Sequence, residues 1–281
     1  MRSRGNGDGI ESLPLTIARG GLSIWPSLTE LQTTFAERHN LPREIGWSPA
    51  RRLKAGYFLP AEIYEATVAK HVFDGCAWVD VGGGHDLFPQ HPDLAGRLAS
   101  RCRSVVAIDP DPSVHDNRVA TERYQCRLEE YTGDRRFHLA TFRMVAEHIE
   151  DPGEVVRALR RLLLPGGVTI VLTVNRWSPL SVVSRLVPFR LHHPVKRLFW
   201  GGDERDTFPV RYRMNTREAL RRVFESEEFT ETGFAYLDDL STFGQMKWPN
   251  AVELALWSAL RSARITYPEN CLLGIYTSAA S

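Results

Sequence analysis

The chain has 281 residues, of which 43% are hydrophobic and 25% are charged, and its formal net charge is +1 at pH 7. This length fits one large domain or one domain with an appendage, and this apolar fraction is enough for a sizeable core. Because a nearly neutral chain has no general electrostatic attraction to a polyanion, nucleic acid is not an expected partner.

The cysteines and the apolar runs indicate in which cellular compartment the protein is expected. The four cysteines (Cys76, Cys102, Cys126 and Cys271) are scattered and form no C-x-x-C pair, which favours neither a zinc site nor a disulfide framework. The first nine residues are not followed by the apolar core of a secretory signal, and no apolar run approaches the length of a membrane span. We therefore expect a protein of the reducing cytoplasm.

The amino-terminal part predicts a polar tail and then helices. Residues 1–20 are rich in Gly and Arg, which is typical of a disordered segment. Residues 21–70 are expected to form a helical preface, with one helix beginning near Leu28 and another near Pro60. The remaining residues, 71–281, are expected to form the main domain.

A glycine-rich bend follows the first strand of that domain. The apolar strand over residues 78–81 carries Asp80 at its end, and Gly82, Gly83 and Gly84 come next. Glycines let the backbone adopt φ > 0 and approach a ligand closely. A strand that ends in an acid and a glycine bend therefore predicts one side of a ligand pocket.

The second strand supplies the other side of this pocket. Residues 104–108 form an apolar run that ends in Asp109. In an open α/β sheet, ligands bind outside the carboxyl ends of the strands, and a glycine loop after the first strand is typical of a nucleotide-type site. A carboxylate at the end of the second strand can accept hydrogen bonds from both hydroxyls of a ribose.

The glycine spacing separates two classes of cofactor. A dinucleotide site would have its third glycine at Leu87, and the charge of Asp80 would repel a pyrophosphate. The same charge suits the cationic amino-acid end of S-adenosylmethionine. The run from Asp80 through Gly84 resembles the first motif of class I S-adenosylmethionine-dependent methyltransferases, acid-x-G-x-G-x-G, with Asp86 standing where a third glycine often sits.

The rest of the chain continues the alternation of strands and helices. Asp151 is expected to cap a helix that ends before Pro165, and residues 215–218 form a second capping box. Residues 176–212 interrupt the alternation and are expected to be a lid-like insertion. Further strands are predicted at residues 137–142, 167–173, 234–237 and 272–276, and a further helix at 252–260. The family resemblance, which covers about residues 50–280, implies an α/β fold with a Rossmann-like, mostly parallel seven-stranded sheet and a final antiparallel strand.

The resemblance also implies a set of cofactor-binding residues. Asp109 is expected to bind the ribose, and Asp80 to bind the methionine end directly or through water. Arg127 stands where relatives often carry an acid near adenine. Leu128, through its backbone, and Glu129, through its carboxylate, are therefore expected to contact the adenine instead. The full cofactor-binding set is Asp80, Gly82, Gly83, Gly84, His85, Asp109, Pro110, Leu128, Glu129, Phe142, Tyr57 and Tyr64.

Arg143 and His148 are the candidate catalytic residues. His148 could be a general base near the methyl group or a structural histidine. Arg143 could pair with an acidic substrate, with the cofactor carboxylate or with a nearby acid. Some ubiquinone-type relatives bind a metal here through E-x-x-E-H. In this chain Met144 replaces the first acid, so Glu147 and His148 alone make a poor site and no metal is expected.

The resemblance implies transfer of a methyl group from S-adenosylmethionine to an acceptor, with release of S-adenosylhomocysteine. We expect a small or lipid-like acceptor, with O-methylation slightly favoured, and peripheral membrane contact is compatible with the basic and aromatic residues of 177–200. Two alternatives stay open. One is a cofactor-binding protein without transferase activity, because Arg127 and Arg143 depart from the family pattern, and the other is an NAD(P)-dependent oxidoreductase.

Overall fold

The computed structural model describes residues 24–41, 46–179, 181, 210–241, 243, 244 and 246–280. The predicted tail over residues 1–20 and most of the predicted insertion over 176–212 lie outside these residues, so both stay predictions.

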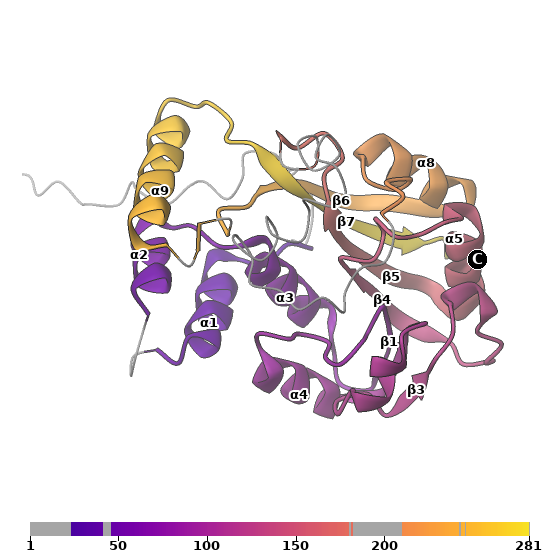
Figure 1. Cartoon of the computed structure of the whole chain (residues 1–281). Helices are drawn as coiled ribbons and strands as arrows, with labels where there is room; N and C mark the ends of the chain where they lie inside the picture. Colours follow the sequence, from indigo (N-terminus) through magenta and orange to yellow (C-terminus); the bar gives the residue numbers. More distant parts are fainter. Residues whose placement is uncertain are drawn as a thin grey trace, which may run out of the picture.

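A seven-stranded mixed sheet forms the centre of the described structure, with the strand order β3-β2-β1-β4-β5-β7-β6 (Figure 1). The first five strands pair parallel to their neighbours, whereas β7 runs antiparallel to both β5 and β6. The predicted α/β fold with a final antiparallel strand is therefore confirmed. The strands are β1 (Cys76–Val81), β2 (Cys102–Ile108), β3 (Glu122–Tyr124), β4 (Phe137–Arg143), β5 (Leu163–Val174), β6 (Phe229–Asp238) and β7 (Glu269–Ser278).

Helices cover both faces of this sheet, as Figure 1 shows. Successive side chains of β1 point to opposite faces. Ala77 and Val79 therefore join a core cluster with α5 and α8, while Trp78 joins a second cluster with α1, α3 and α4. The helices are α1 (Leu28–Arg38), α2 (Trp47–Ala55), α3 (Pro60–His71), α4 (Pro92–Arg101), α5 (Pro152–Leu162), α8 (Arg217–Ser226) and α9 (Lys247–Ser262), with 3-10 turns η1 (Pro112–Asp116) and η2 (Leu128–Glu130).

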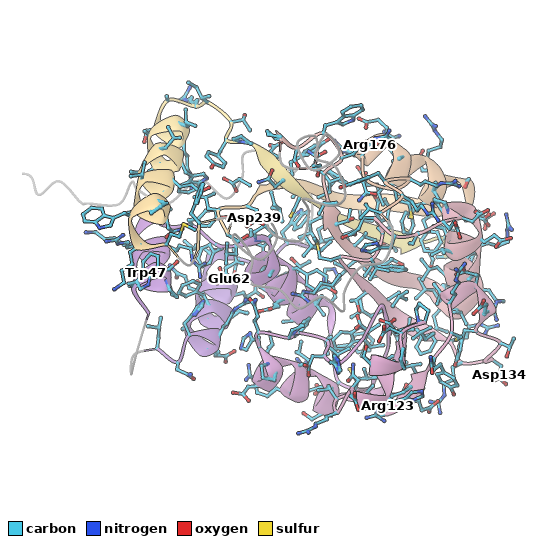
Figure 2. All side chains as sticks on the ribbon, in the orientation of Figure 1. Trp47, Glu62, Arg123, Asp134, Arg176 and Asp239 are labelled. Carbon is cyan, nitrogen blue, oxygen red and sulfur yellow. The ribbon has the colours of Figure 1, made fainter. Side chains whose placement is uncertain are left out.

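The predicted helical preface contains α1, α2 and α3, and a buried ion pair joins α2 to α3. Arg52 of α2 donates to Glu62 Oε2 of α3 at 2.6 Å, and both side chains are buried. Figure 2 labels Glu62 on α3, among these helices. Burial alone would raise the pKa of Glu62, but hydrogen bonds from His39 and Arg52 and the charge of Arg52 lower it to about 2.

A second buried carboxylate ties the preface to the main domain. Glu65 of α3 accepts from Arg38 of α1 at 2.6 Å and contacts His91, the residue that precedes α4, at 3.1 Å. All three side chains are nearly excluded from solvent. One turn of α3 therefore carries two acids that connect it to three other segments of the chain.

The caps and some element limits differ in detail from the sequence expectations. Asp151 caps α5 as predicted, because its side chain accepts from the Glu154 N–H. The cap of α8 is Thr216. Asn215 is instead buried and donates to Thr173 Oγ1 at 2.8 Å. The helices α2 and α4 and the strand β3 were not predicted, and β3, at three residues, is too short to leave a periodic pattern.

The glycine bend after β1 requires a glycine at its first position. Gly82 has φ +74°, and its N–H donates to Ile108 O of β2 at 2.8 Å. A Cβ added there would lie 2.1 Å from Val145 Cγ2. Both the backbone conformation and the close approach of Val145 therefore exclude a larger residue.

We expect Gly82→Ala to lower the free energy of unfolding by about 2 kcal/mol or more, because a left-handed conformation costs a residue with a Cβ about 1–2 kcal/mol and the overlap with Val145 adds to that cost. Urea denaturation followed by circular dichroism measures this change. The matched control is Gly96→Ala in α4, where a Cβ meets nothing within 4 Å. This control should raise stability by roughly 0.5–1 kcal/mol, and equal effects at the two positions would contradict the prediction.

Candidate active site

The carboxyl ends of β1, β2 and β4 meet at one edge of the sheet. Asp80 of β1 pairs in register with Ala107 of β2 on one side and with Thr141 of β4 on the other. The glycine bend, Asp109 and Arg143 follow or end these strands, so they lie along the same edge. This meeting of residues from separate strands was predicted from the strand-end acids.

Asp80 is buried within a chain of hydrogen bonds. Its Oδ1 accepts from Thr141 Oγ1 at 2.5 Å, and Thr141 Oγ1 in turn accepts from Trp78 Nε1 at 2.6 Å. Burial raises the pKa of the Asp80 carboxyl to about 7, which the Thr141 hydrogen bond and the charge of Arg143 partly offset. The site therefore contains a carboxyl that can gain or lose a proton near neutral pH.

Arg143 and Tyr64 complete what we call the Asp80 group, which consists of Trp78, Asp80, Thr141, Arg143 and Tyr64. Arg143 is the last residue of β4, and the buried Nε atom of its guanidinium has no hydrogen-bond partner among the described residues. The buried hydroxyl of Tyr64, which reaches in from α3, interacts with Thr141 but makes no hydrogen bond of regular geometry with the described residues. Burial raises the pKa of Tyr64, and the charge of Asp80 adds to this effect. A buried donor without a partner is costly, so both groups point to a missing polar ligand.

Asp109 organises the glycine bend. Its Oδ2 accepts from Gly84 N at 3.0 Å, and its Oδ1 accepts from Asp111 N at 2.8 Å. An ionised carboxylate offers about four lone-pair sites, so these two bonds are compatible with further hydrogen bonds to a ligand. Asp109 thereby joins the glycine bend after β1 to the loop after β2, and its role toward a ribose stays a prediction.

Asn117 supports the same bend and was not predicted. Its side chain is fully buried, and its Nδ2 donates to Gly83 O at 2.9 Å. Its Oδ1 accepts from Val119 N and Ala120 N, each at 3.1 Å. The residue lies in a loop 33 positions after Gly84, and no local pattern in the sequence links the two. The role of Thr141 as a partner of Asp80 was not predicted either. A threonine within an apolar strand that pairs with β1 could have indicated a hydrogen bond to Asp80.

Other predicted cofactor contacts lie away from the Asp80 group. His85 is exposed, and its Nδ1 lies 3.6 Å from Asp116 Oδ2, so the structure does not bring it to this group. Pro110 is exposed directly after Asp109. The ring of Phe142 is buried in the core cluster that includes α5 and α8, which leaves its backbone as the part available at the strand end.

The predicted adenine segment forms the short turn η2. Leu128 is buried in the same core cluster, and Glu129 is half-buried. Arg127 is exposed, its N–H donates to Glu130 Oε2 at 2.9 Å, and its Nη1 lies 3.8 Å from Glu150. The roles of Leu128 and Glu129 toward adenine stay predictions.

Tyr57, the other aromatic residue proposed from the preface, lies in a separate cluster. Its hydroxyl donates to Asp238 O at 3.1 Å and accepts from Leu240 N at 2.9 Å. Its ring meets the ring of Trp257 of α9 edge-on, with the centroids 5.0 Å apart. Tyr57 therefore joins the preface to the end of β6, whereas Tyr64 reaches the Asp80 group.

Glu147 and His148 lie in a turn between β4 and α5. The buried Glu147 carboxyl accepts from Thr173 Oγ1 at 2.8 Å, and its pKa is raised by burial. Its backbone oxygen accepts from Arg211 N at 2.7 Å, which ties residue 211 to this turn. Glu147 is thus a structural anchor here, and His148, its half-buried neighbour, keeps its predicted role as a proposal. Within the described ranges, no three His, Cys, Asp or Glu side chains are grouped so that they could hold a metal ion.

The chain matches a family model described as a methyltransferase domain over residues 41–232. It is similar to the mitochondrial ubiquinone biosynthesis O-methyltransferase of Arabidopsis thaliana, with 30% identity over 112 residues that cover 37% of this chain and 34% of that protein. It is also similar to the ubiquinone biosynthesis O-methyltransferase of Coxiella burnetii, with 27% identity over 139 residues that cover 46% of this chain and 57% of that protein. The chain thus spans between about a third and just over half the length of these curated relatives.

Among solved structures, the chain is similar to a putative methyltransferase from Bacillus halodurans C-125. The sequence identity is 17%, the TM-score is 0.46, and the likeness covers 75% of this chain and 96% of that one.

The raised pKa of Asp80 predicts the pH dependence of stability in the absence of ligand. The folded-state pKa of about 7 exceeds the ordinary value of 3.8, so the protonated carboxyl stabilises the folded state. This contribution to the free energy of unfolding is fully present below about pH 4 and is lost as the pH rises to about 7. Relative to Asp80→Asn, the native protein should lose up to about 4 kcal/mol of unfolding free energy across this window.

Urea denaturation of both proteins at several pH values between 4 and 7.5 checks this prediction. The matched control is Asp134→Asn, which alters an exposed carboxyl that Figure 2 labels at the periphery of the molecule. The control should follow the native protein, and parallel curves for Asp80→Asn and the native protein would show that Asp80 does not titrate as proposed.

Proposed function

The chain belongs to the methyltransferase-domain family, and on this premise we propose that it binds S-adenosylmethionine at the carboxyl edge of the sheet and transfers the methyl group to an oxygen of a small or lipid-like acceptor. The observation that carries the proposal is that the Asp80 group combines a buried acid with a cation whose charge acts on it. Asp80 is a buried acid, and Arg143 is a cation whose buried Nε donor has no partner among the described residues.

These residues fit the amino-acid end of the cofactor. That end carries one ammonium and one carboxylate, and a carboxylate beside a guanidinium complements both charges. The Tyr64 hydroxyl supplies a further polar group at the same place. Each orphaned donor would gain a partner when the cofactor binds, so binding relieves a cost that the structure otherwise carries.

Asp109 and the glycine bend would hold the ribose. The carboxylate of Asp109 is oriented by two backbone N–H groups, so it is pre-organised to accept from ribose hydroxyls. The glycines at positions 82–84 allow the backbone to approach the cofactor closely. We propose that Leu128 and Glu129 contact the adenine. His85, in the loop after β1, and Tyr57, in the preface, would affect cofactor binding only through the positions of these segments.

The bound cofactor supplies an electrophilic methyl group on sulfur, and the protein's contribution is to hold the acceptor in line with it. Orientation of this kind can supply about 7–11 kcal/mol of barrier reduction. An acceptor hydroxyl must also lose its proton, and His148 is the candidate base, with an expected contribution of about 10²–10⁴-fold. The names of the curated relatives support an oxygen acceptor. A cytoplasmic location and action without a metal belong to the same proposal.

The charge-pairing assignment predicts different effects on two ligands. S-adenosylhomocysteine has the amino-acid end, whereas 5′-deoxy-5′-methylthioadenosine lacks it. Asp109→Ala should weaken both ligands by roughly 2–3 kcal/mol, about 30–150-fold, because it removes two hydrogen bonds to the ribose. Arg143→Gln should weaken only S-adenosylhomocysteine, by about 10-fold or more. Isothermal titration calorimetry measures all four affinities.

The control for this experiment is Asp116→Ala, which removes an exposed acid from η1, close to Asp109 in the chain, and should leave both affinities unchanged. If Arg143→Gln weakened the binding of both ligands equally, the guanidinium would not be binding the amino-acid end. If Asp109→Ala left the affinity for both ligands unchanged, the proposal that Asp109 binds the ribose would be wrong.

Transferase activity is tested with methyl-labelled S-adenosylmethionine and a panel of phenolic, amine and carboxylate acceptors. We expect label in phenolic acceptors, turnover that survives EDTA, and a fall in kcat of about 10²–10⁴-fold in His148→Ala with little change in S-adenosylhomocysteine affinity. His115→Ala, which alters an exposed histidine of η1, is the matched control. Cofactor binding without transfer to any acceptor would instead favour a non-catalytic protein, and loss of activity in EDTA would contradict the metal-free reaction.

A further inference from the structure

The outward face of α9 is apolar, which is unusual for a helix at the surface. Trp248, Val252 and Leu256 follow one another at intervals of four residues and are 82%, 67% and 52% exposed. Trp248 is the most exposed large apolar side chain in the described part of the chain, and Ile265, just beyond the helix, is 57% exposed. Surface helices normally present polar residues to water, so this face calls for a partner.

The opposite face of α9 is already occupied. Asn250, Glu253, Leu254 and Trp257 recur at helical spacing and are buried. Trp257 packs against Tyr57 and donates through its Nε1 to Asp238 Oδ2, so α9 is held firmly by its inner face. The exposed apolar stripe is therefore separate from the face of α9 that meets the core.

Basic residues lie on α9 and on the neighbouring helix α2. α2 lies beside α9 (Figure 1), and Arg51 of α2 donates to Lys247 O of α9 at 3.2 Å. Figure 2 labels Trp47 on α2 at this end of the molecule. The two helices contain a single acid, Glu253, which is buried. Arg52 of α2 is buried in its pair with Glu62. The other cations of α2, α9 and the turn that follows are the exposed Arg51, Lys54, Lys247 and Arg264 and the half-buried Arg261.

We propose that the α9 face, defined as the outward residues of α9, its following turn and α2, docks on an anionic membrane surface. Apolar and aromatic side chains that enter the lipid interface, ringed by Lys and Arg that meet anionic headgroups, are the features that such a surface recognises. None of the described helices is long and apolar enough to cross a membrane. A symmetric dimer through this face would place the same cations opposite one another, which disfavours a second copy as the occupant.

The place of α9 in the fold relates this surface to the candidate site. α9 connects the end of β6 to the start of β7, and Asp238 pairs there with Glu269. Cys271 of β7 pairs with Val174 at the carboxyl end of β5. The docking face thus stands at the edge of the sheet that carries the Asp80 group, so docking would turn this edge toward the membrane. The proposal itself does not depend on methyl transfer.

Vesicle flotation with the full-length chain tests the proposal. We expect binding to vesicles of phosphatidylcholine with 30% phosphatidylglycerol, weaker binding to phosphatidylcholine alone, and loss of binding in high salt. The combined variant Trp248→Ser, Val252→Ser, Leu256→Ser should lower the partition coefficient at least about tenfold. The combined charge variant Lys54→Glu, Arg264→Glu should do the same on anionic vesicles.

Matched controls alter equivalent residues elsewhere on the surface. Phe73→Ser removes an exposed apolar side chain before β1, and Arg222→Glu reverses an exposed cation on α8, and neither should change partitioning. An unchanged circular dichroism spectrum and urea unfolding transition show that each variant is folded. Equal binding of native protein and α9 variants, or no preference for anionic vesicles, would overturn the proposal.

Two further measurements separate other occupants of the face. Light scattering after size exclusion would reveal a dimer that the combined α9 variant dissociates, and this result would assign the face to a second copy. Acrylamide should quench a share of the tryptophan emission that Trp248→Ser removes. If it did not, the face would be covered in solution by another part of the chain, and membrane docking would be wrong.

Discussion

Asp80 lies near the end of β1, between β2 and β4, and is excluded from water. Its carboxyl accepts a hydrogen bond from Thr141 and lies within the electrostatic influence of Arg143. A carboxylate taken out of water needs partners or a proton, and here it has one hydroxyl donor and a pKa near neutrality. The segments around it must therefore present polar groups in an otherwise apolar sheet. Thr141 is placed by strand register, Arg143 by the end of β4 and Tyr64 by α3.

The position of α3 follows from a second set of buried charges. Glu62 and Glu65 flank Tyr64 in the helix and pair with Arg52 and Arg38. A buried ion pair contributes little net stability, but losing one partner leaves an uncompensated charge, which is strongly unfavourable. This asymmetry restricts α3 to the position in which both pairs form. Tyr64 is consequently directed toward Asp80, and the preface becomes part of the candidate cofactor site.

The same sheet edge continues to the end of β6 and to α9, where the exposed residues are apolar and basic. Tyr57 bonds to backbone groups at the end of β6 and packs on Trp257, so α9 is fixed to the main domain although its outer face is apolar and basic. The candidate cofactor site and the proposed docking face of α9 thus lie at one edge of the sheet. For an amphipathic acceptor, this arrangement would shorten the path between the membrane surface and the methyl group.

The sequence by itself predicted the sheet class, the glycine bend and the two strand-end acids, because each depends on local properties: apolar runs of strand length, glycines that permit positive φ, and acids at fixed offsets. It also named Arg143 and Tyr64 among the candidates, but it left several partners open for Arg143. Only the tertiary structure brought these two residues to Asp80, placed Tyr57 in another cluster and revealed Thr141 and Asn117. Their contacts join segments far apart in the chain, such as Asn117 with Gly83 and Tyr57 with Asp238. The outward face of α9 could not be recognised from sequence either, since its apolar residues are distinguished from core residues only by which side of the helix the rest of the fold covers.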